Sequence, residues 1–128
     1  MRYVALLAAI LFFSSPIAAQ STSAQLAQQT ADAALRVLNV ATTRYATGLG
    51  TADDVGSAGV RWFQARKDTG ISGAALIAAA QDWVTKMRAF EQTVQSKVQS
   101  GAASTYDSEL ATFYRLQAET QLARLRTP

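Results

Sequence analysis

Three acidic residues, Asp53, Asp54 and Asp107, come nearest to a chemical function in this chain. A pair of carboxylates held in a cleft can act as general acid and general base. The structural alternative is an acid in the first turn of a helix, where it interacts favourably with the helix dipole. No serine, threonine or lysine has a visible assisting base beside it, so no catalytic residue is predicted and an enzyme is not expected.

The residue types that are missing narrow the chemistry further. The chain has no histidine and no cysteine, which removes the commonest ligands of zinc and haem and the usual proton carrier. A single thioether such as that of Met87, without either residue type nearby, does not make a copper site. The sequence therefore predicts no metal site and no cofactor.

The stretch from Arg44 to Val55 reads RYATGLGTADDV and could be mistaken for a phosphate-binding loop. Such a loop needs a strand before its glycines and the spacing Gly-x4-Gly-Lys-Ser/Thr, and both are missing here. The stretch is better interpreted as the turn between two helices.

A shift of 53 positions aligns this stretch with a second one. Glycine can end a helix in the left-handed conformation, Ser or Thr can cap the next helix, and Asp suits its first turn. A match at one fixed offset indicates a duplicated helical hairpin. The aligned pairs are Arg44 and Lys97, Gly48 and Gly101, Thr51 and Ser104, Asp54 and Asp107, Ala58 and Ala111, Gln64 and Gln117, and Ala65 and Ala118.

The segment Tyr45-Ala-Thr-Gly48-Leu49-Gly-Thr51-Ala-Asp-Asp54-Val55, with Ala58 after it, resembles the signature of TolC-type outer-membrane efflux proteins. Gly101-Ala-Ala-Ser104-Thr-Tyr-Asp107, with Ala111 after it, resembles a second copy. The resemblance extends from Arg44 to Leu125 and implies periplasmic helical hairpins whose tips contact adaptor proteins. No alternating strand pattern for a membrane barrel is present, so a pore is not implied. The candidate tip contacts are Tyr45, Gly48, Leu49, Thr51, Gly101 and Ser104.

The elements that carry these tips are expected to be helices. Proline is absent between Pro16 and Pro128, and alanine is abundant. We expect an all-α fold, either an elongated antiparallel four-helix bundle or two coiled-coil-like hairpins. The predicted helices span residues 23–47, 52–67, 73–100 and 105–126, with a capping box formed by Thr22 and Gln25 at the first start.

Apolar residues at three- and four-residue steps predict the core. Gly56 and Gly59 each cost a helix interior about 1 kcal/mol relative to alanine, so the second helix is expected to be the weakest and to depend on packing. Phe63 lies beside the stripe of the second helix, and Leu110 and Phe113 widen that of the fourth. In chain order the stripes are Ala31, Ala34, Leu38, Ala41 and Tyr45; Val55, Gly59 and Trp62; Leu76, Ala80, Trp83, Met87, Phe90 and Val94; and Ala111, Tyr114, Ala118, Leu122 and Leu125.

The first 19 residues are typical of a secretory signal peptide. The apolar run from Val4 to Phe13 is shorter than the roughly 20 residues that a spanning helix needs, so no transmembrane anchor is expected after cleavage behind Ala19. Residues 20–128 would then form one helical domain that is periplasmic or secreted.

These features favour a cell-envelope protein that acts by protein–protein contact. The partner would be an envelope protein, and the resemblance implies an efflux adaptor. A ligand- or client-binding, chaperone-like bundle with exposed Trp62 or Trp83 is the alternative. The 12 Lys and Arg and 9 Asp and Glu are scattered singly, which gives nucleic-acid binding little support, and self-association is left open.

Overall fold

The computed structural model describes the backbone of residues 17–128 and the side chains of residues 22–128. Most of the expected signal peptide, residues 1–16, lies outside this part of the chain. The described residues form four helices and no strand: α1 (Ile17–Ala46), α2 (Ala52–Asp68), α3 (Gly73–Gln99) and α4 (Thr105–Arg126). The all-α prediction is confirmed.

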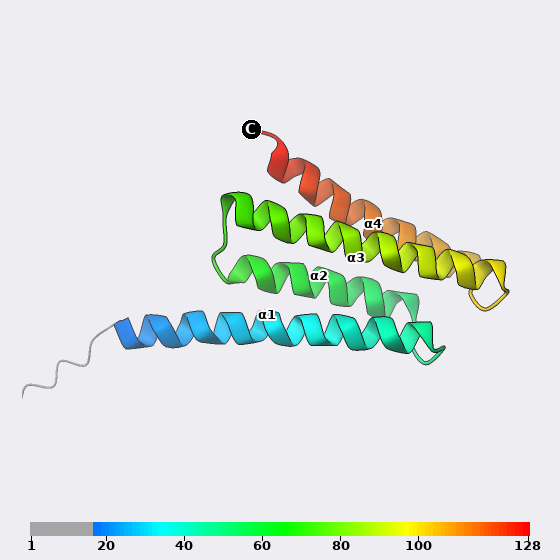
Figure 1. Cartoon of the computed structure of the whole chain (residues 1–128), viewed down its shortest axis with the longest axis horizontal. Helices are drawn as coiled ribbons and strands as arrows, with labels where there is room; N and C mark the ends of the chain where they lie inside the picture. The colour runs from blue at the N-terminus through cyan, green and yellow to red at the C-terminus, as the bar shows by residue number, and fades with distance from the viewer. Residues whose placement is uncertain (1–16) are drawn as a thin grey trace, which may run out of the picture.

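Each helix runs antiparallel to the one before it in the chain, and the four helices form two hairpins, α1–α2 and α3–α4 (Figure 1). Helices α1 and α2 pack on each other, with the N-terminal part of α1 extending beyond α2 (Figure 1), and helices α3 and α4 also pack on each other. Helix α2 also packs on both α3 and α4, which joins the hairpins into one elongated bundle. Both glycine turns lie at the same end of the bundle, and the α2–α3 connection lies at the other end.

Three of the four predicted helices match the observed bounds to within one residue. The start of the first helix is different, because α1 begins at Ile17 and not near residue 23. The predicted capping box is therefore wrong: Thr22 and Gln25 lie inside the helix.

The core lies along the stripe predicted for α3. Trp83 stacks on Phe63 with ring centroids 4.8 Å apart, and Phe90 meets Tyr45 edge-on at 5.3 Å. The predicted stripe residues of all four helices are buried or partly buried. Phe113 is the exception: it is 56% exposed, so the prediction that it widens the core of α4 is wrong.

Helix α2 is held by close approach of its neighbours at two glycines. A Cβ added at Gly56 would lie 1.9 Å from Cδ2 of Tyr114, and one added at Gly59 would lie 2.9 Å from Cε of Met87. The glycines reduce the helix propensity of α2, but they let an aromatic ring of α4 and a side chain of α3 rest against its backbone. The expected dependence of α2 on packing has this physical origin.

Gly56→Ala tests the close approach. Helix propensity alone would raise the stability by about 1 kcal/mol. The overlap with the Tyr114 ring should instead lower the free energy of unfolding by about 2 to 3 kcal/mol, because the ring cannot move without disturbing the α2–α4 contact. Urea unfolding measures the difference.

The neighbouring Ser57→Ala is the control and should change the stability by less than about 0.5 kcal/mol. In a Tyr114→Ala background the cost of Gly56→Ala should shrink, since the obstructing ring is gone. A Gly56→Ala protein as stable as its parent would contradict this account of α2.

Candidate functional site

The first hairpin tip closes α1 through a left-handed glycine. Gly48 has φ +81°, its N–H donates to the carbonyl of Tyr45 at 3.1 Å, and the N–H of Leu49 donates to the carbonyl of Arg44 at 2.8 Å. Glycine adopts this conformation without the steric penalty of a side chain. The last carbonyl groups of α1 are thereby satisfied and the chain reverses.

Helix α2 then begins with a reciprocal capping box. The N–H of Asp54 donates to Oγ1 of Thr51 at 3.1 Å, and the N–H of Thr51 donates to Oδ2 of Asp54 at 2.9 Å. Two N–H groups that the helix cannot satisfy internally are bonded in this way. The tip is consequently fixed on both sides by local hydrogen bonds.

The second tip repeats the same hydrogen bonds. Gly101 has φ +76° and donates to the carbonyl of Val98 at 3.0 Å, while Ala102 donates to the carbonyl of Lys97 at 2.7 Å. Ser104 and Asp107 form the second capping box, with distances of 3.2 and 3.1 Å. The sequence repeat is thus a repeat of conformation.

Most of the predicted tip contacts lie on the surface. Gly48, Leu49, Thr51, Gly101 and Ser104 are exposed, and the side chain of Leu49 is 71% exposed.

Tyr45 differs from the other candidates, since it is only 6% exposed and belongs to the core. Its ring contacts Phe90, and Nζ of Lys97 lies 5.4 Å from the ring centroid, a cation–π contact between the two hairpins. Tyr45 therefore packs in the core beneath the first tip and is not exposed for contact with a partner.

Each of the three acids Asp53, Asp54 and Asp107 has a structural role. Asp54 and Asp107 belong to the two capping boxes, and Oδ1 of Asp53 accepts a hydrogen bond of 2.6 Å from the hydroxyl of Tyr114. The bond from the backbone N–H of Thr51, followed by that with its side chain, lowers the pKa of Asp54 below its ordinary value. Each acid is bonded to a different partner, which agrees with the structural interpretation.

Comparison of the chain with known protein families, curated proteins and solved structures finds no match. Within the part of the chain that the structure describes, no group of acidic side chains could hold a metal ion. None of the described helices has the length and apolar character needed to cross a bilayer.

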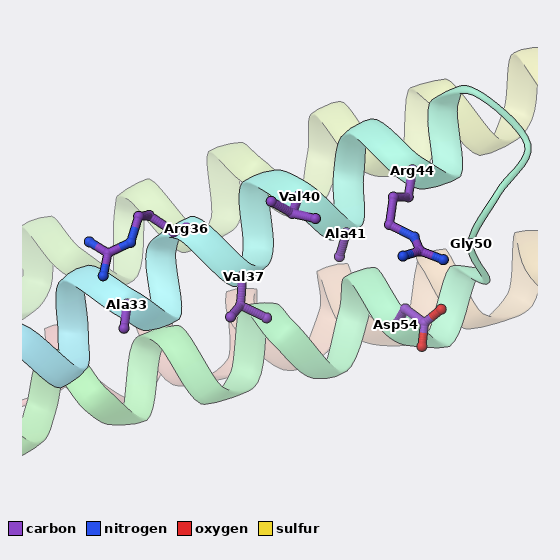
Figure 2. A pocket seen from close by; sticks show the side chains of 8 residues that line it. All are labelled: Ala33, Arg36, Val37, Val40, Ala41, Arg44, Gly50 and Asp54. Atoms are coloured by element: carbon purple, nitrogen blue, oxygen red, sulfur yellow. The ribbon is translucent and has the colours of Figure 1, made fainter.

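A groove beside the first tip was not predicted from the sequence. It encloses about 590 Å³ between α1 and the start of α2 (Figure 2). Val37 and Val40 are the sequence signal for it, because both are apolar and lie off the core stripe of α1. The lining residues are Ala33, Arg36, Val37, Val40, Ala41, Arg44, Gly50 and Asp54.

The alternative of a client-binding bundle expects an exposed tryptophan. Trp62 is 3% exposed and Trp83 is 2% exposed, so neither indole is presented to a client.

Removal of the first cap by Thr51→Ala should destabilise the protein by about 1 kcal/mol near neutral pH. The pKa of Asp54 should rise part of the way toward its ordinary value, because the backbone N–H of residue 51 is still present. A carboxyl group whose pKa is lower in the folded than in the unfolded protein stabilises the fold at pH values above its unfolded pKa. This contribution is lost as the pH falls through the folded pKa. The difference between parent and variant should therefore narrow in acid, as NMR titration and urea unfolding can measure.

Ser104→Ala is the matched variant at the second tip, and its cost should be similar. Equal stability of parent and Thr51→Ala at neutral pH would contradict the capping role.

The hydroxyl of Tyr114 should make the stability of the protein decrease at alkaline pH. Burial, and then the hydrogen bond to Asp53, raise the pKa of Tyr114 to about 12. A tyrosine with a raised folded pKa contributes stability that is complete below its unfolded pKa near 10 and is lost as the pH rises through 12. Tyr114→Phe should therefore lose less stability than the parent between these pH values, as measured by urea unfolding. Parallel alkaline profiles of the two proteins would contradict the assignment.

Proposed function

We propose that this chain is an exported cell-envelope protein, periplasmic or secreted, that acts by protein–protein contact through its two hairpin tips. The observation that supports this function is the pair of tips at one end of the bundle, built from the same hydrogen bonds, with an exposed leucine on the first. An apolar side chain at a hydrogen-bonded turn loses little conformational freedom on binding, which favours affinity.

The two tips differ in the side chain that follows the closing glycine. Leu49 holds this place in the first tip and Ala102 in the second, and both are exposed. Leucine can fill an apolar pocket on a partner, whereas alanine permits a close approach of the backbone. In this proposal Leu49 is the anchor, and the second tip orients the contact.

The resemblance to TolC-type efflux proteins supports the same function. In that family the hairpin tips face adaptor proteins, and the matching residues here are Gly48, Leu49 and Thr51 at the first tip and Gly101 and Ser104 at the second. An envelope protein, with an efflux adaptor as the first choice, is the proposed partner. The apolar run before Ala19 supports export of this chain. When this protein is purified from cells, its first residue should be Gln20.

A photo-crosslinking residue at Ala102 in living cells tests the contact. The probe should form an adduct with one envelope protein, and Leu49→Asp should lower the adduct yield about tenfold, because the anchor on the neighbouring tip is lost. The exposed Thr85→Asp on α3 should leave the yield unchanged. Mass spectrometry identifies the partner and the mature N-terminus.

A probe at Ser72, at the opposite end of the bundle, is the spatial control and should give no adduct. An adduct that survives Leu49→Asp, or one that forms equally from Ser72, would refute contact through the tips.

A further inference from the structure

The large apolar side chains that remain exposed are confined to three places among the described residues. Leu49 lies at the first tip. The other six lie on the two outermost helices, three on α1 and three on α4: Leu26, Val37, Val40, Tyr106, Phe113 and Leu116. Helices α2 and α3, which lie in the middle of the bundle, expose none.

On each outer helix these residues belong to a regular stripe that the core does not use. The outer seam of α1 consists of Leu26, Thr30, Ala33, Val37, Val40 and Arg44, and that of α4 consists of Tyr106, Glu109, Phe113, Leu116, Thr120 and Ala123. Both follow the alternating three- and four-residue steps of a heptad repeat, the spacing by which two helices interlock. Every member is exposed except Ala33, which is half-buried.

The two outer seams cannot satisfy each other within one chain. Helix α1 packs mainly on α2, and helix α4 packs on α3 and α2. Figure 1 shows α1 and α4 on opposite sides of the bundle.

The two outer seams are complementary when they run antiparallel. Steps of four, three and four residues back from Arg44 match equal steps forward from Glu109. The facing pairs are Arg44 with Glu109, Val40 with Phe113, Val37 with Leu116, and Ala33 with Thr120.

Charge and shape select the same alignment. Arg44 and Glu109 are the only charged residues in the two seams, and Glu109 forms no ion pair within the described part of the chain. The exposed ring of Phe113 on α4 would face Val40, which lines the groove of about 590 Å³ (Figure 2). The hollow on the α1 side is lined by Arg36, Arg44 and Asp54, so it carries a net positive charge, and the α4 side offers a ring and a negative charge.

We propose that the outer seams of α1 and α4 are the two halves of one self-association interface, in which α1 of one copy packs antiparallel on α4 of the next. The alignment of Arg44 with Glu109 keeps the tips of neighbouring copies at the same end. Because the two halves are different surfaces, the contact is head-to-tail, and each copy can bind two neighbours. A single helix pair lies at the small end of protein interfaces, so the dissociation constant should be on the order of micromolar.

Sedimentation velocity of the purified protein tests the interface through two variants. Val40→Glu disables the α1 half and Phe113→Glu disables the α4 half, and each should weaken self-association at least tenfold. A mixture of the two variants should form a one-to-one dimer with the affinity of the parent contact, since one copy still supplies an intact α4 and the other an intact α1. The dimer should not grow further.

Thr85→Glu on the exposed face of α3 is the charge-matched control and should associate as the parent does, and circular dichroism should show all variants equally helical. A parent that stays monomeric up to about 100 µM, where a micromolar contact is saturated, would overturn the proposal. So would a single variant that associates like the parent, or a mixture that stays monomeric. No tip residue is changed, so the result is independent of the proposed tip contact.

Discussion

Close approach at Gly56 and Gly59 is the constraint on which the rest of the fold depends. Helix α2 packs on all three other helices. Its contacts with α4 and α3 are close because the ring of Tyr114 and the side chain of Met87 occupy the space that a side chain at these positions would need. Tyr114 also reaches Asp53 on α2 with its hydroxyl, which adds a directional bond to the contact. The two hairpins are thereby joined with a defined orientation.

This orientation places the two tips where one partner could contact both. Each tip is closed by its own glycine and capping box and would form wherever its hairpin lies. That both tips face the same way follows from the hairpin packing (Figure 1). The same packing leaves no large apolar side chain exposed on α2 and α3 but leaves the outer faces of α1 and α4 uncovered, so the proposed tip contact and the proposed self-association use separate surfaces.

Local signals made most of the fold predictable. The breaks at Gly48 and Gly101, and the caps at Thr51 and Ser104, follow from short-range chemistry, and the predicted heptad stripe of α3 was correct. Apart from the start of α1, where the predicted capping box is wrong, the errors concern tertiary context. A ring at helical spacing can face the core, as in Tyr45, or water, as in Phe113, and only the position of the neighbouring helices decides between them. The role of Gly56 and the groove beside Val37 depend equally on distances between helices, which one sequence does not encode locally.

Native-state hydrogen exchange of α2 tests the central claim most directly. If packing against Tyr114, Trp83 and Met87 holds this glycine-containing helix, the amides between Val55 and Ala65 should exchange only through global unfolding, with the same free energy and denaturant dependence as the buried amides of α3. Exchange of α2 through local opening at distinctly lower free energy, while α3 stays protected, would contradict the claim that α2 joins the two hairpins.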